Sequence, residues 1–150
     1  MIQRIQSLYL FAGIVLSAAI IFSTIFYVSS DAGNVLLGAF GAKEGDLEIE
    51  LIPMLPVGIL AGISIALQGY AIALFKNRKL QINIIRLSML MTVLVIGFLG
   101  FVYYDLTQTN LTVIPFVGVF HAPLVLFANA LAIRGIKKDE ALVKSVDRLR

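Results

Sequence analysis

Two apolar blocks joined by a short basic turn decide the fold: Pro53–Phe75 (PMLPVGILAGISIALQGYAIALF), Lys76–Lys79 (KNRK) and Ile82–Tyr103 (INIIRLSMLMTVLVIGFLGFVY). Each block has about the 20 residues that an α-helix, rising about 1.5 Å per residue, needs to cross roughly 30 Å of hydrocarbon. Inside a bilayer every backbone amide must find its partner within the segment, so such blocks form helices. The short turn makes the two helices antiparallel neighbours.

Two further apolar blocks flank this pair, so we expect four membrane spans, at about residues 5–28, 53–75, 82–103 and 113–133. The first block follows Arg4 and could be mistaken for a signal peptide, but its apolar run is too long for one. The composition agrees, because 59% hydrophobic and 14% charged residues leave too little polar surface for a soluble domain of 150 residues. The absence of cysteine excludes disulfides and thiolate sites.

The Lys and Arg residues predict the orientation of these spans. Eleven of them fall on one side of the membrane, at the two termini and in the turn between spans two and three, and Lys43 alone falls on the other. Because cytoplasmic loops are enriched in Lys and Arg, both termini are predicted to be cytoplasmic. The basic balance therefore reflects topology and does not indicate a nucleic-acid partner.

The segment between spans one and two predicts a small extracytoplasmic β-hairpin at about residues 34–51. Residues 34–40 form its first strand, Lys43–Asp46 its turn, and the strict alternation of Leu47–Leu51 its second strand. Leu111–Ile114, just before Pro115, offers a third strand, in which case span four begins near Phe116.

The tail at residues 134–150 predicts a cytoplasmic amphipathic helix. Leu142, Val146 and Leu149 recur at spacings of four and three and form an apolar stripe. Gly135 is a natural place for this helix to bend away from span four. The predicted fold class is thus an all-α membrane protein, a single four-transmembrane-helix bundle over residues 1–150, with the hairpin outside and the amphipathic helix inside.

The two ends of the chain carry a family resemblance. They are Met1–Leu10 (MIQRIQSLYL) and the string from Ala132 through Lys137-Lys138-Asp139-Glu140 to Asp147-Arg148-Leu149-Arg150. With the layout of the whole chain, these ends resemble a family of small four-helix inner-membrane proteins of unknown function found in Bacteroidota. The resemblance implies a location in the bacterial inner membrane, and it implies no activity, cofactor or catalytic residue.

Several polar residues lie within the predicted spans, and none of them is a carboxylate, lysine or arginine deep in the membrane. Hydrogen bonding between helices is the main explanation for such residues, and a substrate pore lined by them is the alternative. Without a deep ionisable group, a carboxylate proton relay is not expected. The residues are Ser17, Ser23, Thr24, Gln68, Ser88, Thr92, His121 and Asn129.

His121 lies between Pro115 and Pro123, where a broken helix exposes backbone carbonyls. The main interpretation is a neutral histidine donating to a carbonyl that the proline frees. The alternative is an acid-base pair with Asp105 or Tyr104 acting on a lipid headgroup. A haem lacks a second axial ligand here, and the acidic residues outside the membrane lack the nitrogen or sulfur ligands that zinc and copper prefer. The sequence therefore predicts no catalytic, cofactor-binding or metal site.

A row of small residues, Gly58, Gly62 and Ala66, runs along span two. Gly13 with Ser17 on span one and Gly118 with Ala122 on span four repeat this spacing. Such rows let helix backbones approach closely. Packing within the chain is the favoured interpretation, and a face for another subunit is the alternative.

The leading functional hypothesis is a non-catalytic accessory or scaffold subunit that docks a partner through its cytoplasmic termini. Its partners would be membrane lipids and either another protein or further copies of this chain. A small oligomeric carrier or channel for a neutral or lipid-like solute is the alternative, and a lipid-modifying enzyme at the outer surface is a third possibility. The docking residues would be Arg4, Lys138, Asp139, Glu140, Leu142, Val146, Asp147 and Arg148.

Overall fold

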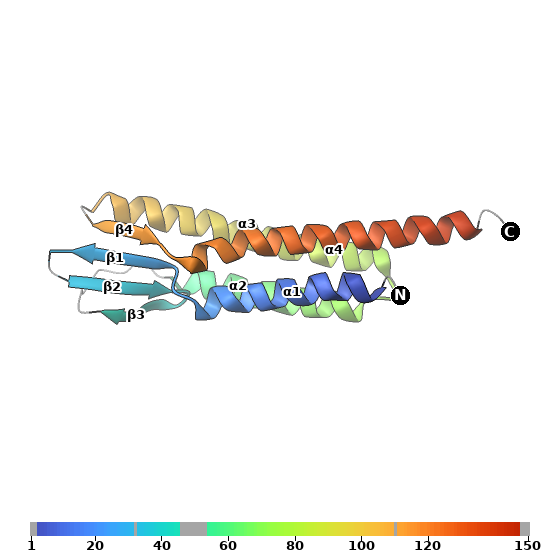
Figure 1. Ribbon diagram of the computed structural model, residues 1–150, viewed down its shortest axis with the longest axis horizontal. Coiled ribbons are helices and arrows are strands. Elements are labelled where there is room, and N and C mark those ends of the chain that lie inside the picture. The colour runs from blue at the N-terminus through green and yellow to red at the C-terminus, as the bar shows by residue number, and fades with distance from the viewer. Residues whose placement is uncertain (1–2, 32, 46–53, 110, 148–150) are drawn as a thin grey trace.

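The computed structural model describes residues 3–31, 33–45, 54–109 and 111–147, and it places four helices side by side with a small sheet at one end. Both termini lie at the other end (Figure 1). In chain order the elements are α1 (Gln3–Phe22), β1 (Phe26–Ser30), β2 (Gly33–Gly38), β3 (Gly41–Gly45), α2 (Leu55–Ala73), α3 (Arg78–Thr107), β4 (Thr112–Pro115) and α4 (Val117–Asp147).

Three of the described helical segments are long and apolar enough to cross a membrane: Leu55–Ala73, Arg78–Thr107 and Val117–Val143. The described part of α1 adds a shorter apolar stretch, Gln6–Phe22. The predicted spans two and three are confirmed as helices. The predicted turn between them is confirmed as well, because α2 ends at Ala73 and α3 begins at Arg78.

The four helices pack along seams with a strict seven-residue repeat, in which buried positions alternate at spacings of four and three. This repeat is typical of bundles whose helices coil gently around each other. Many of the buried residues are small or polar, whereas large apolar side chains such as Leu90 and Phe101 are exposed on the outside of the bundle. The seams comprise Gln6, Leu10, Gly13, Ser17 and Ile20 of α1, Val57, Ala61, Ser64, Gln68 and Ala71 of α2, Gln81, Ile85, Ser88, Thr92, Val95, Leu99, Val102 and Leu106 of α3, and Gly118, Ala122, Val125, Asn129, Ala132, Ile136 and Asp139 of α4.

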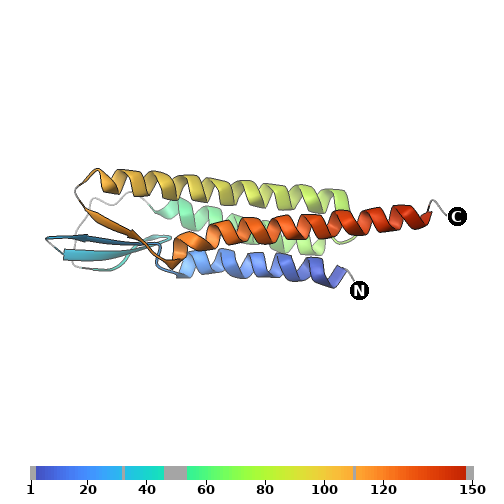
Figure 2. The ribbon, with the colours of Figure 1, turned by 45° about the horizontal axis from the view of Figure 1, so that its top comes forward.

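The sheet has the strand order β3-β2-β1-β4 and is antiparallel throughout. Alternate residues of β1 and β2, such as Phe26, Val28 and Val35, face the bundle and join one buried cluster with Leu99 and Val102 of α3. The last turns of α3 extend beside the sheet, as the rotated view in Figure 2 also shows. The sheet is therefore packed on a helix and does not stand alone in water, where a small sheet would be marginal.

The structure corrects the first predicted span. The helix ends at Phe22, and the apolar residues that follow form strand β1 instead of a further helical turn. The backbone of Ile25 donates to Leu37 O at 2.8 Å and accepts from Phe116 N at 2.8 Å. Because neighbouring strands satisfy the backbone groups after Phe22, this segment needs no helix, and its β-branched and aromatic residues suit a strand.

The predicted hairpin at residues 34–51 is also corrected, and with it the all-α fold class. Its first strand becomes β2, but Lys43 and Glu44, predicted to turn, belong to β3, which pairs with β2 after a tight turn at Ala39 and Phe40. The predicted second strand, at residues 47–51, lies outside the described residues. The third strand is confirmed as β4, which pairs with β1. Span four therefore does not begin at residue 113, and α4 begins at Val117, next to the start at Phe116 expected if this strand formed.

The last correction concerns the tail. We expected a bend at Gly135, but α4 continues unbroken from Val117 to Asp147. Gly135 lies against α1, where a Cβ would stand 3.0 Å from Cγ of Gln6. A glycine at this position therefore serves the close approach of two helices, and it leaves the helix straight.

Candidate functional site

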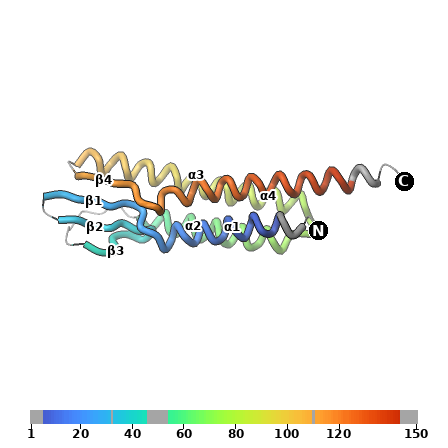
Figure 3. Tube along the Cα trace, viewed as in Figure 1, coloured from blue at the N-terminus to red at the C-terminus, as the bar shows by residue number. Residues whose placement is uncertain are grey.

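At the end of the molecule that holds both termini, α4 projects beyond its neighbours. The Cα trace in Figure 3 follows α4 past the beginning of α1, and the ribbon views agree. With 31 residues, α4 is about 45 Å long, whereas the hydrocarbon of a bilayer is roughly 30 Å thick. About two or three turns of α4 therefore lie outside the hydrocarbon.

The root of this extension is tied to α1 by a buried hydrogen bond. Nε2 of Gln6 donates to Oδ2 of Asp139, and the two residues are only 6% and 7% exposed. Asp139 was predicted to dock a partner, but its side chain accepts a hydrogen bond from Gln6 of the same chain. The contact instead joins α4 to α1 at the point where α4 leaves the bundle.

Basic side chains lie just before this tie, and apolar side chains lie beyond it. Lys137 and Lys138 are exposed, and Leu142 and Val143 are 46% and 49% exposed. Glu140 is half-buried. The structure thus leaves Lys138 and Leu142 accessible among the predicted docking residues. The side chains of Arg4, Val146 and Asp147, and the whole of Arg148, lie outside the described residues.

A second feature is a polar cluster at the centre of the bundle, to which all four helices contribute. Its hub is Gln68, whose Nε2 lies 3.0 Å from Oγ of Ser64, 3.1 Å from Oγ of Ser88 and 3.3 Å from Oγ of Ser17. Oγ of Ser64 lies 2.9 Å from Oγ of Ser88 and 3.4 Å from Oγ1 of Thr92. All of these side chains are at most 2% exposed. The cluster confirms hydrogen bonding between helices for the predicted polar residues Ser17, Gln68, Ser88, Thr92 and Asn129.

Sequence reasoning missed one member of this cluster, Ser64, and it named Gly13 with Ser17 as a packing contact without linking it to Gln68. Gly13 faces the amide of Gln68, because a Cβ at Gly13 would overlap Gln68 Oε1 and stand 3.3 Å from Asn129 Oδ1. The signal that could have found Ser64 is its spacing of four from Gln68, which places both residues on the same seam.

The predicted small-residue row on span two is only partly packed within the chain. A Cβ at Gly58 would overlap the ring of Phe40, so the sheet turn rests on this glycine. Around Gly62, in contrast, a Cβ would meet nothing within 4 Å, and Ala66 is exposed. The favoured interpretation of the row is therefore wrong for Gly62 and Ala66, which turn away from the bundle, and a contact with another subunit stays a prediction.

His121 does not make the hydrogen bond that we expected. Its Nδ1 is buried, and no partner among the described residues reaches it. Pro123 sits inside α4 two residues later, where it removes one backbone donor from the helix. The pairing of His121 with Asp105 or Tyr104 also finds no hydrogen bond in the described part of the chain.

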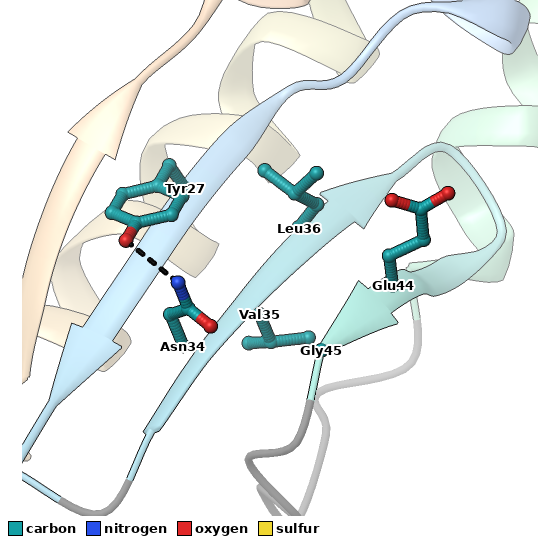
Figure 4. Close-up of a pocket in the computed structure, with 6 residues that line it drawn as sticks. All are labelled: Tyr27, Asn34, Val35, Leu36, Glu44 and Gly45. Carbon is teal, nitrogen blue, oxygen red and sulfur yellow. Dashed lines mark hydrogen bonds between the residues drawn. The ribbon is translucent and has the colours of Figure 1, made fainter.

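On the outward face of the sheet lies a shallow cavity of about 310 Å³, lined by Tyr27, Asn34, Val35, Leu36, Glu44 and Gly45 (Figure 4). Nδ2 of Asn34 donates to the Tyr27 hydroxyl at 3.0 Å. Gly45 has a φ of +147°, and a Cβ there would overlap the backbone of β2, so only glycine lets β3 approach this closely. The hydroxyl of Tyr27, the carboxamide of Asn34 and the carboxylate of Glu44 thus border this cavity, together with the apolar side chains of Val35 and Leu36.

Lys43, the one basic residue at the sheet end, has a structural partner. Its Nζ donates to the carbonyl of Phe22, the last residue of α1, while its aliphatic stem lies over Gly38. The last carbonyls of a helix lack partners within the helix and carry partial negative charge. Lys43 therefore caps α1, which explains a lysine in a segment that is otherwise acidic.

Together these features define a multi-pass helical membrane protein with a four-stranded antiparallel sheet at one end and a projecting helix at the other. The chain belongs to the family described as Domain of unknown function (DUF4293), whose family model matches residues 2–149. No curated protein matches the chain.

Proposed function

We propose that this protein is a non-catalytic accessory subunit of the bacterial inner membrane that docks a cytoplasmic partner protein on the projecting end of α4. The observation that carries this proposal is the continuity of α4, which leaves the bundle as a straight helix with Leu142 and Val143 exposed. The continuous helix favours a partner over lipid, because a helix that only adheres to lipid would bend to lie along the membrane surface.

The chemistry of the extension indicates what kind of partner fits. Leu142 and Val143 offer an apolar ridge, and Lys137 and Lys138 lie one turn earlier, toward the membrane. An apolar groove with acidic side chains at its membrane-facing rim would complement this helix, in the manner of other helices that bind in grooves. The tie between Gln6 and Asp139 holds the helix in one direction, which reduces the entropy lost on docking.

Copurification from native membranes in mild detergent tests the proposal. The double variant Leu142→Gln/Val143→Gln should keep its expression level and thermal stability and lose a copurifying protein that the unaltered chain retains. Ile114→Gln is the matched control, because Ile114 is 49% exposed at the opposite end of the molecule. If the double variant retains the same proteins as the unaltered chain, α4 is not the docking element.

A further inference from the structure

An apolar cavity of about 210 Å³ lies between α3, α4 and strand β1. Its most buried lining residues are Phe26 and Leu99, which are only 2% and 4% exposed. The other lining residues are Ile96, Gly100, Val119 and Pro123. Ile96 is 36% exposed, and Gly100 and Pro123 are exposed as well, so the cavity opens on the outside of the bundle.

The position of the cavity along α3 places it within the hydrocarbon of the membrane. Between Arg86 and Asp105 this helix carries no charged residue, and residues 87–104 span about 27 Å as a helix. This length is close to the roughly 30 Å of hydrocarbon in a bilayer. Ile96 and Gly100 lie in the half of this stretch that is nearer the sheet. The cavity therefore faces the acyl chains of the leaflet on the sheet side.

The size and the lining of the cavity suit a hydrocarbon chain. An apolar cavity of about 150 Å³ is enough to hold a molecule of the size of benzene, and such a cavity excludes water. The side chains that line the present cavity offer no hydrogen-bond donor or acceptor. An empty cavity would leave its lining without dispersion contacts on one side. At Gly100 a Cβ would meet nothing within 4 Å, so this glycine leaves the opening free.

Two tyrosines next to the cavity indicate the level of the lipid headgroups. The ring of Tyr103 stacks on that of Phe26, with the ring centroids 6.2 Å apart, about one turn of α3 from Gly100 toward the sheet. Tyr103 and Tyr104 are 41% and 64% exposed. Tyrosine is enriched where hydrocarbon meets headgroups, because its ring is apolar and its hydroxyl is polar. A phospholipid whose headgroup lies at this level reaches the cavity with the adjoining part of its acyl chain.

We infer that this cavity binds an acyl chain of a phospholipid from the leaflet on the sheet side. The bound chain packs on Phe26 and Leu99 and fills the space between α3 and α4. A phospholipid is favoured over a second copy of this chain, because acyl chains surround the opening at this depth and match its apolar lining. The site is independent of the proposed docking role, since α4 projects at the opposite pole (Figure 1).

Photo-crosslinking of the full chain in phosphatidylcholine bilayers tests the site. The probe is a phosphatidylcholine with a diazirine in the half of its acyl chain that is nearer the headgroup, and mass spectrometry maps the crosslinked residues. The label should reach Phe26 and Leu99. It should not reach Val28 and Val95, which are equally buried on the same strand and the same helix but do not line the cavity. If Phe26 and Leu99 stay as free of label as Val28 and Val95, no chain enters the cavity and the proposal is overturned.

Two glycines on α3 provide a matched pair of variants. A Cβ at Gly100 or at Gly97 would meet nothing within 4 Å, so both Gly100→Leu and Gly97→Leu should fold, but only Gly100 lines the cavity. Gly100→Leu should lose the label on Phe26 and Leu99, and Gly97→Leu should keep it. A label that survives Gly100→Leu would overturn the proposal. So would a dimer of the unaltered chain, seen by native mass spectrometry, that Gly100→Leu converts to a monomer, because a second copy would then occupy the cavity.

Discussion

Two helical glycines, Gly13 on α1 and Gly97 on α3, show how much one missing methyl group can matter. Gly13 lies against the amide of Gln68, whereas a Cβ at Gly97 would meet nothing within 4 Å. Gly13→Ala should lower the free energy of unfolding by about 1 to 3 kcal/mol, because Gln68 is held by three hydroxyls and cannot move aside freely. Gly97→Ala should leave stability unchanged or slightly raised. Unfolding in detergent measures both, and equal stability of the two variants would contradict the packing at Gly13.

Lys43 supports a second prediction at the scale of single residues. Lys43→Met keeps most of the stem over Gly38 and removes the ammonium that caps α1. We expect the amides in the last turn of α1 to exchange with deuterium about twofold to fivefold faster, which is the effect of losing a favourable charge at a helix terminus. Lys43→Arg, which keeps the charge, is the control. Unchanged exchange in Lys43→Met would mean that the cap is unimportant.

At the scale of elements, the tie between α1 and α4 fixes how the projecting helix leaves the bundle. Gln6→Leu leaves the carboxylate of Asp139 buried without its donor, so we expect a loss of about 1 to 3 kcal/mol of stability and faster hydrogen exchange at Ala141–Val143. Gln6→Leu/Asp139→Leu, which removes both polar partners, should recover much of this loss. A double variant that is as unstable as Gln6→Leu would show that packing, and not the hydrogen bond, holds the two helices together.

The same scale shows what the sequence can predict. Spans two and three follow from hydrophobic length, because hydrocarbon thickness sets a minimum that these blocks meet. Length cannot show that residues 26–30 leave the helix, since Phe26 and Val28 are apolar in either state, and only pairing with β2 and β4 decides between them. The central cluster could be predicted in part: the polar residues stand out, but their meeting with Gly13 depends on how four seams align in space.

At the scale of the whole molecule, the two longest helices are staggered. The far end of α3 projects beyond the bundle beside the sheet, which buries Val102 and Leu106, whereas the far end of α4 projects at the opposite pole and exposes Leu142 and Val143. The sheet covers the projecting end of α3, whereas the projecting end of α4 stays accessible. This arrangement is suited to a partner that binds at the end of α4. The stagger thus links the arrangement of the helices to the proposed docking role.

The orientation of these two poles in the membrane is the last prediction. Both termini and the turn between α2 and α3 lie at one pole, and eleven of the twelve Lys and Arg residues fall in or next to these segments of the sequence. This pole should therefore be cytoplasmic, and the sheet should face the outside. Because the chain has no cysteine, Ala42→Cys in the exposed strand β3 and Ala141→Cys in the projecting part of α4 provide single reactive thiols. A membrane-impermeant maleimide should label Ala42→Cys in cells whose inner membrane is intact, and label Ala141→Cys only after that membrane is opened. The reverse pattern would place the projecting helix outside, where no cytoplasmic partner could reach it.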